Sequence, residues 1–260
     1  MAVEAVTPVP PREVGRTVFT QTWADLMFVH WAVEPERVRP YLPAGVRPDT
    51  FDGKTYVGLI PFRMRRIGLL RTPGLPYLGS FLETNVRLYS VDRQGRRGVV
   101  FVSLDATRLL PVLAARLGPR LPYLWSSMGY RREGDRITYT CARRPWAGPL
   151  ARSPVVGQAG VKAPAANASS RVSVTVGPRI PAHQVGELEH WMTARWGLHL
   201  SRYYWPNAHG TWPLHRARLD HLDDGLLSAA GFGDLATKQP DSVMFSPGVH
   251  SVFGPRTPAG

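Results

Sequence analysis

The segment FLETNVRLYS, residues 81–90, carries the alternation that decides how this chain folds. Side chains on a β-strand point alternately to its two faces, so the even positions from Leu82 to Leu88 form a face that can be buried. The opposite face consists of Phe81, Glu83, Asn85, Arg87 and Tyr89. An ordinary solvent-exposed face would rarely place two aromatic rings around three polar groups. This face therefore differs from that of a strand lying on the surface.

The next segment, GVVFVSLDA at residues 98–106, is expected to pair with the first as an antiparallel hairpin, because the intervening DRQGRRG has turn chemistry. Its even positions are again apolar, and its odd positions are Val99, Phe101, Ser103 and Asp105. One register sets Glu83 opposite Asp105 and Asn85 opposite Ser103. A register shifted by two residues sets Arg87 opposite Ser103 and Asn85 opposite Asp105. Both registers gather the charged side chains into one patch.

A patch of this kind could perform acid/base chemistry if it lined a closed interior. In a low-dielectric interior, burial would raise the pKa values of Glu83 and Asp105, whereas the positive charge of Arg87 would lower them. If the two effects differ between the two carboxyl groups, one can serve as an acid and the other as a base. We predict Glu83 and Asp105 as catalytic residues. The predicted substrate-binding residues are Arg87, Asn85, Tyr89, Phe101 and Ser103. The alternative is a structural ion-pair network on a wet sheet face, with the aromatic rings packed on arginine stems.

The remaining segments predict a β-rich α+β protein. β-Branched and aromatic runs indicate strands at 17–33, where the chain forms two strands or one bent strand, and further strands at 55–61, 135–144 and 171–176. Helices are expected at 34–45, near 109–117, and over 181–197, where Gly197 ends the pattern. We expect a closed or nearly closed antiparallel barrel with a few helices packed outside it. Residues 1–15 are predicted to be a loose arm, 16–255 a single domain, and 145–170 a flexible loop within it.

The formal net charge of +13 does not by itself indicate a nucleic-acid partner. Three of the 32 basic residues are lysines, a ratio that the codon bias of a GC-rich genome would produce. The arginines are scattered, and no RNP, zinc-finger or heptad context surrounds them. Nucleic-acid binding is therefore not favoured. The N-terminus has no signal-peptide pattern and no apolar run could span a bilayer, so a cytoplasmic protein without membrane association is expected.

Motifs for metal, cofactor and nucleophile chemistry are missing from the sequence. The single cysteine, Cys141, excludes an internal disulfide and a CxxC motif. The eight histidines include no HExxH motif, and His30, beside Trp31 in an apolar strand, is expected to be a hydrogen-bonded core residue. There is no GxSxG, no phosphate loop and no dinucleotide fingerprint. We predict neither a metal nor a cofactor.

Several collinear segments resemble one family over about residues 20–254. They are LMFVHWAVEPERVRPYLPAGVRPDTFDGKTYVGLIPF (26–62), FLETNVRLYS, GVVFVSLDA, TWPLHRA (211–217) and SVMFSPGV (242–249). In this order they are similar to the uncharacterised DUF2071, or YqjF-like, family, which looks like a branch of the acetoacetate decarboxylase superfamily. The resemblance implies a cone-shaped β-barrel with its active site inside. It also implies that the odd face of 81–89 points into that barrel.

The same resemblance implies that Schiff-base chemistry has been lost. Acetoacetate decarboxylase forms an imine between a buried lysine and a β-keto acid, and also uses a glutamate, to which Glu83 looks like the counterpart. The lysine should fall near Pro111, where the chain has Leu110, Val112 and Leu113. None of these can form an imine.

Three functional hypotheses follow. The first is acid/base chemistry of lyase or isomerase type on a small organic acid or carbonyl compound in the barrel interior, without a Schiff-base lysine. The second is a non-catalytic protein that binds a small molecule in the same pocket, so that catalysis itself is left open. The third is nucleic-acid binding through the arginines. A homo-oligomer is compatible with this architecture, although no apolar stripe indicates one.

Overall fold

The structure is a computed structural model that describes residues 2–69, 79–108, 121–144 and 167–259. Strands make up most of these residues, as the sequence predicts. They are β1 (Phe19–Val33), β2 (Val46–Pro48), β3 (Thr55–Leu69), β4 (Phe81–Asp92), β5 (Arg97–Ala106), β6 (Tyr123–Glu133), β7 (Arg136–Arg143), β8 (Ser169–Arg179), β9 (Gly197–His199), β10 (Tyr203–His209), β11 (His215–Asp224), β12 (Ser242–Phe253) and β13 (Thr257–Pro258). The α-helices are α1 (Pro35–Val38), α3 (Glu187–Thr193) and α4 (Leu226–Ala229), and 3₁₀ turns cover Arg39–Tyr41, Ala182–Gln184 and Gly233–Thr237.

The sheet closes on itself because β4 and β5 pair with each other as well as with their other neighbours. The ring runs β5-β6-β7-β8-β11-β12-β1-β3-β4 and returns to β5. A second closure arises where β10 pairs with both β12 and β9, and β9 pairs with β5. The pairs within the described residues are antiparallel except β5–β6 and β5–β9. The predicted closed, strand-rich architecture is confirmed.

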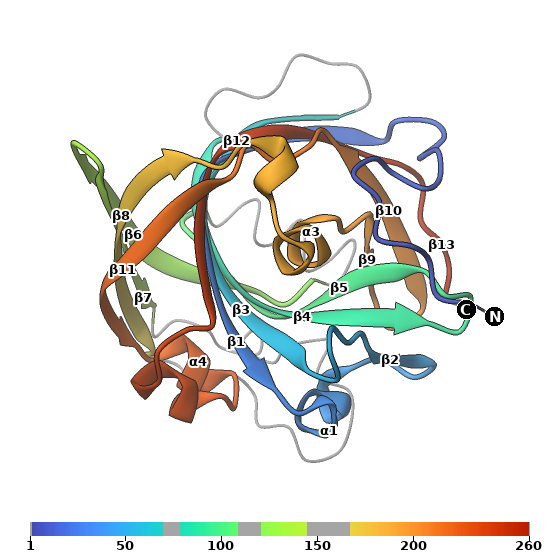
Figure 1. Cartoon of the computed structure of the whole chain (residues 1–260), viewed down its shortest axis with the longest axis horizontal. Coiled ribbons are helices and arrows are strands. Elements are labelled where there is room, and N and C mark those ends of the chain that lie inside the picture. Colours follow the sequence, from blue (N-terminus) through green and yellow to red (C-terminus); the bar gives the residue numbers. More distant parts are fainter. Residues whose placement is uncertain (1, 70–78, 109–120, 145–166, 260) are drawn as a thin grey trace.

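Strands β1, β3, β4 and β5 form a wall shared by two apolar cores (Figure 1). The first core lies on the side of β9, β10 and α3, and includes Phe62, Tyr89 and Trp191. The second lies toward β7, β8 and α4, and includes Val86 and Ile137. Because alternate side chains enter different cores, each strand of the shared wall is buried on both faces.

Helix α3 packs inside the ring rather than outside it (Figure 1). The ring of Trp191 lies 4.7 Å from that of Tyr89, and both side chains are buried. The single helix predicted over 181–197 is wrong, because a 3₁₀ turn, seven helical residues and β9 share this segment. The helix ends at Thr193, and β9 begins at Gly197, which packs so closely against the ring of Tyr204 that a Cβ would clash with it. The helix predicted near 109–117 lies outside the described residues.

An irregularity in the β4–β5 pairing sets which side chains share a face. Glu83 pairs with Ala106 and Asn85 with Leu104, but beyond a register shift between Val86 and Arg87, Arg87 pairs with Phe101. The extra residue lies on β5, at Val102. A bulge of this kind reverses which residues of β5, odd-numbered or even-numbered, share a face with the odd-numbered residues of β4. The predicted register with Glu83 opposite Asp105 is therefore wrong before the shift and holds beyond it, where Tyr89 pairs with Val99, and the register shifted by two residues is wrong throughout.

The bulge turns Ser103 and Asp105 away from the predicted patch. Asp105 accepts hydrogen bonds from Arg143 Nε at 2.8 Å, from Arg143 Nη2 at 2.9 Å and from Ser126 Oγ at 2.8 Å. The side chains of Arg143 and Asp105 are 3% and 0% exposed. The expectation that Asp105 and Ser103 lie beside Glu83 is corrected, and Asp105 forms a buried bidentate ion pair on the other face of β5.

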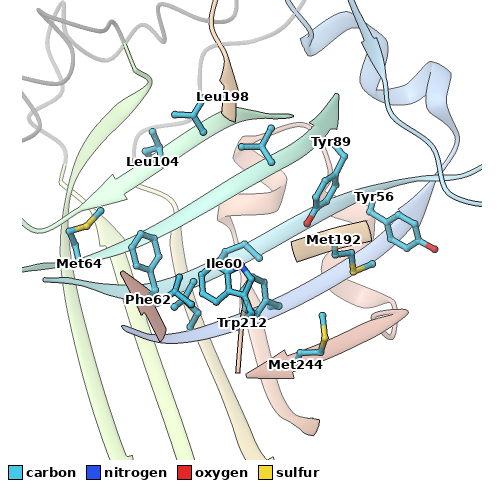
Figure 2. Close-up of a cluster of buried hydrophobic side chains, with 14 of the residues drawn as sticks. Tyr56, Ile60, Phe62, Met64, Tyr89, Leu104, Met192, Leu198, Trp212 and Met244 are labelled. Carbon is cyan, nitrogen blue, oxygen red and sulfur yellow. The ribbon is translucent and has the colours of Figure 1, made fainter. Parts of the chain in front are cut away.

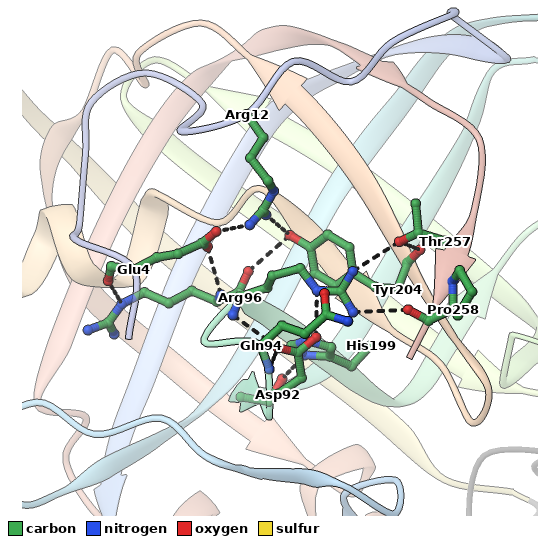
Figure 3. Close-up of polar contacts among 11 residues, drawn as sticks. Glu4, Arg12, Asp92, Gln94, Arg96, His199, Tyr204, Thr257 and Pro258 are labelled. Atoms are coloured by element: carbon green, nitrogen blue, oxygen red, sulfur yellow. Dashed lines mark hydrogen bonds and ion pairs between the residues drawn. The ribbon is translucent and has the colours of Figure 1, made fainter. Parts of the chain in front are cut away.

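Both ends of the chain are anchored at the β4–β5 turn (Figure 3). In the arm that the sequence predicts to be loose, residues 2–15 have no helix or strand, but Glu4 N donates to Gly95 O at 3.0 Å and Glu4 Oε2 accepts from Arg97 N at 3.0 Å. At the other end, Arg96 donates to Thr257 Oγ1 at 3.1 Å and to Pro258 O at 3.0 Å. The turn is thus held from two sides.

The predicted loop 145–170 falls mostly outside the described residues, and its last two residues begin β8. The predicted bent strand at 17–33 is confirmed as β1, whose pairing with β3 shifts register between Ala24 and Val29. No helix in the described ranges combines the length and the apolar character that a membrane span requires.

The Asp105–Arg143 pair should be essential for stability. Asp105→Asn removes the charge that compensates a buried guanidinium, and breaking a buried pair in this way typically costs about 3–5 kcal/mol. We expect urea unfolding to report a loss of that order. Glu133→Gln is the matched control, because its pair with Arg131 is exposed and should contribute less than about 1 kcal/mol. Equal, small losses in the two variants would contradict the structural role of Asp105.

Candidate functional site

A cavity of about 200 Å³ lies within the first core. Residues of β1, β3, β4, β5, β6, β9, β10 and β12 line it, together with the end of α3 and the residues that follow it. From β4 it receives Phe81, Glu83, Asn85 and Arg87. The expectation that the odd face of 81–89 points into the ring is therefore confirmed for these four residues.

Most of the cavity wall is apolar. Ile60, Phe62 and Met64 of β3, Leu104 of β5, and Trp212 all contribute to it, and Figure 2 shows these side chains converging from separate elements. They belong to the first core, so the cavity is continuous with well-packed hydrophobic structure. A polar group in such surroundings loses most of its contact with water.

Glu83 is the one carboxylate that lines the described wall of the cavity, and it is 3% exposed. Its Oε2 accepts a hydrogen bond of 2.7 Å from the hydroxyl of Tyr123, at the start of β6, and the Asn85 amide also bonds to it. Burial raises the pKa of Glu83 to about 7, despite these two bonds, which act to lower it. Burial likewise raises the pKa of Tyr123 well above its ordinary value, so its hydroxyl remains a donor. Glu83 can therefore gain or lose a proton near neutral pH.

Arg87 lies two residues further along the same face as Asn85. It donates to the hydroxyl of Tyr89 from Nε at 3.2 Å and from Nη2 at 2.8 Å, and Nη2 also lies 3.4 Å from Met192 O. Among the described residues, no carboxylate forms an ion pair with it. Arg87 thus leaves a positive charge on the cavity wall that no carboxylate there neutralises.

A buried histidine completes this corner of the site. His30 Nε2 lies 2.7 Å from Tyr89 Oη, and burial, followed by Arg87 and Arg195, lowers the pKa of His30 well below its ordinary value. It is a buried, hydrogen-bonded core residue, as the sequence predicts. Gly58 separates His30 from Arg87, and a Cβ there would come within 2.9 Å of His30 Nε2. The glycine allows both side chains to fit on this face.

Arg195 lies on the other side of the Tyr89 ring. Its guanidinium carbon is 4.7 Å from the centroid of that ring and 4.2 Å from that of Trp191. Nη1 pairs with Asp49, which also pairs with Arg97. Arg195 lines the cavity as well. One carboxylate thus serves two arginines, so this corner keeps an excess of positive charge.

The structure brings some predicted site residues together and separates others. Glu83, Asn85, Arg87 and Phe101 line the cavity, and Tyr89 is buried on the same face, where it holds Arg87. Ser103 and Asp105 do not line it.

Sequence reasoning missed six polar residues of the described wall, namely Gln21, Tyr123, Thr193, Arg195, Asn207 and His209. Their segments are distant from 81–90 along the chain. An alternation on β10 that places Asn207 and His209 on one face could have indicated them.

The lysines and the metal-binding residue types can be placed relative to this cavity only within the described residues. No lysine lines its described wall, and Lys54 and Lys238 form exposed pairs with Glu34 and Asp234. Lys162 lies outside the described residues, as do Leu110, Val112 and Leu113. In the described ranges, no three His, Cys, Asp or Glu side chains come together as they would around a metal ion.

Sequence comparison matches residues 20–250 to DUF2071, described as an uncharacterized conserved protein. The chain is also 35% identical over 130 residues to the uncharacterized protein YqjF of Bacillus subtilis (strain 168). That match covers 50% of this chain and 53% of YqjF, so it spans about half the length of each.

Two solved structures have a similar fold. An acetoacetate decarboxylase-like enzyme from Sphingomonas wittichii RW1 has a TM-score of 0.58 at 11% identity, with 96% of each chain covered. The enduracididine biosynthesis enzyme MppR, complexed with the condensation product of pyruvate and imidazole 4-carboxaldehyde, has a TM-score of 0.54 at 13% identity, covering 95% of this chain and 92% of that one. These likenesses confirm the predicted acetoacetate-decarboxylase-like fold.

The raised pKa of Glu83 predicts a pH-dependent stability. Between about pH 4.5 and 7 the folded chain keeps a proton that the unfolded chain has lost, so the free energy of unfolding falls as pH rises. At about 1.4 kcal/mol per pKa unit, the contribution is on the order of 3 kcal/mol. Glu83→Gln removes it, so the variant should gain stability relative to the wild type between pH 5 and pH 8 in urea unfolding.

The quantity to measure is the difference in free energy of unfolding between Glu83→Gln and the wild type. The lowered pKa values of His30 and His209 also make stability depend on pH, but they affect both proteins equally. Glu187→Gln, at an exposed position of α3, serves as the control and should follow the wild type at both pH values. A constant difference between Glu83→Gln and the wild type from pH 5 to pH 8 would show that Glu83 titrates as it does in the unfolded chain.

Proposed function

This chain belongs to the DUF2071 family of uncharacterized conserved proteins, and we propose that it binds a small organic acid with a carbonyl group inside the ring and moves a proton on it. Glu83 is the general acid or base, and Arg87 anchors the carboxylate of the substrate. The reaction needs no imine. One observation carries this proposal, a buried Glu83 whose pKa of about 7 is set by an apolar cavity that also contains an unneutralised guanidinium.

The environment of Glu83 suits proton transfer at neutral pH. A general acid or base works best when its pKa lies near the working pH, because both protonation states are then populated. The short hydrogen bond from Tyr123 fixes one carboxylate oxygen, and Asn85 restrains the group further. The wall of the cavity is mostly apolar, and a low local dielectric strengthens each electrostatic interaction within it.

Arg87 suits the recognition of a carboxylate. A guanidinium presents paired donors whose geometry matches a carboxylate, and it remains charged in buried sites. The two bonds to Tyr89 and the contacts of its guanidinium carbon with the rings of Phe28 and Tyr89, at 5.5 Å and 5.3 Å, hold Arg87 in place. The carboxylate of a ligand that enters the cavity would give Arg87 the ion-pair partner that no described carboxylate provides.

The cavity volume supports a small ligand. At about 200 Å³ it is below the roughly 300–1,000 Å³ of pockets that hold drug-sized molecules. Since MppR, which shares the fold, is complexed with a condensation product of pyruvate, 2-oxo acids are reasonable first probes.

The chemistry that these residues can perform is proton exchange at the carbon next to a carbonyl. Glu83 as carboxylate removes the proton, and the electron pair of the C–H bond moves onto the carbonyl oxygen to give an enolate. Return of a proton from Glu83 to the same carbon regenerates the starting compound, whereas protonation elsewhere gives an isomer. Each is an acid/base step that consumes no other reagent.

Deuterium exchange tests this proposal directly. The protein is incubated in D₂O with pyruvate, 2-oxobutyrate and acetoacetate in turn, and loss of the α-proton signal is followed by NMR. We expect exchange above the buffer rate for at least one acid, and a loss of at least about 100-fold in that rate for Glu83→Gln, in line with the usual contribution of a general base. Arg87→Met should raise the apparent KM more than it lowers kcat, and Arg65→Met, at an exposed arginine of β3, is its control.

Binding without exchange would identify the protein as a non-catalytic binder that uses the same pocket. That result would be recognised by isothermal titration in which an acid binds the wild type, loses affinity with Arg87→Met, and exchanges no proton. Exchange that persists unchanged in Glu83→Gln would rule out the assigned base.

The absence of a lysine from the described cavity wall gives a separate prediction. Borohydride reduction in the presence of acetoacetate should leave the mass of the protein unchanged, because no imine forms. Mass spectrometry of the intact protein provides the measurement, and an adduct that maps to Lys162 would overturn the proposed chemistry.

A further inference from the structure

The cavity has a second polar wall, which faces the wall that carries Glu83 and Arg87. We infer that the ligand has a neutral hydrogen-bonding group, such as a hydroxyl, at the end remote from its carboxylate, and that Asn207 binds this group. The inference rests on the proposed function, because Arg87 is taken to hold the carboxylate end. It narrows the substrate class to organic acids with a polar group at each end and an apolar middle.

The position of Asn207 follows from strand pairing. Asn207 pairs with Phe253 across β10 and β12, and Phe253 pairs with Phe19 across β12 and β1. The adjacent row on the same face contains Gln21, Ser251 and His209. Strands β10 and β12 lie across the ring from β4, with α3 between them in projection (Figure 1). The second polar wall is therefore formed by Gln21, Asn207 and His209, which line the cavity, while Ser251 lies between Gln21 and His209 in the same row of the sheet.

One acceptor on this wall is buried without a protein partner. Asn207 lines the cavity at 4% exposure, and its Oδ1 has no hydrogen bond to any described residue. A buried polar atom left unpaired destabilises the folded protein, because it has lost its hydrogen bonds to water. A ligand that donates a hydrogen bond to Asn207 Oδ1 would replace one of them.

The second wall is uncharged, so it does not suit another carboxylate. Burial lowers the pKa of His209 to about 4, which keeps its ring neutral, and Nδ1–H donates to Gly210 O at 2.8 Å. Gln21 and Asn207 carry no charge. A hydroxyl can be recognised here because it needs only an acceptor or a donor, whereas a second anion would lose its hydration without gaining a counter-charge.

An apolar zone separates the two polar walls. Phe28, Ile60 and Trp212 line the cavity, and the ring of Trp212 packs edge-on against Phe28 at 5.2 Å. The body of the ligand between its carboxylate and its distal hydroxyl would contact these side chains. The arrangement selects an acid whose middle is a hydrocarbon chain or ring.

Matched pairs of acids test the inference. Straight-chain 2-oxo acids from 2-oxobutyrate to 2-oxooctanoate are compared by isothermal titration with analogues that carry a terminal hydroxyl in place of the terminal methyl. For the chain length that spans the cavity, we expect the hydroxyl to tighten binding to the wild type by about threefold to tenfold, as one well-made hydrogen bond would do. In Asn207→Leu, which replaces the amide with an alkyl group of similar size, the preference should disappear or reverse.

The controls separate this inference from the proposed function. Gln94→Leu makes the same kind of change at an exposed site and should keep the preference for the hydroxyl. Retained binding of the unsubstituted acid by Asn207→Leu shows that the variant folds, and Asn207→Ala replaces it if the leucine blocks the cavity. Equal affinity of the wild type for both members of every pair would overturn the inference and leave the proposed function intact. Failure of every acid to bind in an Arg87-dependent way would overturn both.

Discussion

The arrangement of the site depends on one extra residue in β5. The pairing of β4 with β5 shifts register between Val86 and Arg87, and this shift decides which side chains of β5 enter the cavity. Before the shift, Leu104 and Ala106 share the face of Glu83, and after it, Phe101 shares the face of Arg87. Without the bulge, Asp105 would lie near Glu83, and two carboxylates would compete for one apolar cavity. Because of the bulge, Glu83 lies on the cavity side of the hairpin, and Asp105 lies on the opposite face.

Glu83 and Asp105 show how burial acts differently on two carboxylates of one hairpin. Asp105 has a bidentate arginine, so its charge is compensated by a cation that is itself buried. Glu83 has a phenol and an amide, which donate hydrogen bonds but carry no charge. Neutral donors offset only part of the cost of removing a carboxylate from water, so Glu83 favours its protonated form. The same reasoning gives Asp105 a structural role and supports a role in proton transfer for Glu83.

The strand-rich fold could be predicted from the local alternation of side chains, whereas the inward face of β4 is implied by the resemblance to the acetoacetate decarboxylase superfamily. Glu83, Asn85 and Arg87 could be placed for that reason. Asp105 could not, because a bulge at Val102 has no signal in a run of apolar residues that alternates regularly on either side of it. Tyr123, Arg195 and Asn207 reach the cavity through pairings of distant segments, which periodicity within one segment does not encode. The helix predicted over 181–197 is wrong for a similar reason, because the residues from Gly197 onward pair with β10 and β5, and pairing with distant strands is not encoded within the segment.

The structure shows how several of the arginines behind the net charge of +13 are used. Arg96, Arg97 and Arg143 are committed to buried or half-buried carboxylates, and they connect strands and chain ends. Arg87 differs from them, because its donors meet a phenol and a backbone carbonyl. A guanidinium that is held rigidly yet paired with no described carboxylate makes the potential of the cavity positive at one wall, while the wall of Asn207 remains neutral. That gradient would orient any anion that enters, with its carboxylate toward β4, the strand that carries both Arg87 and Glu83.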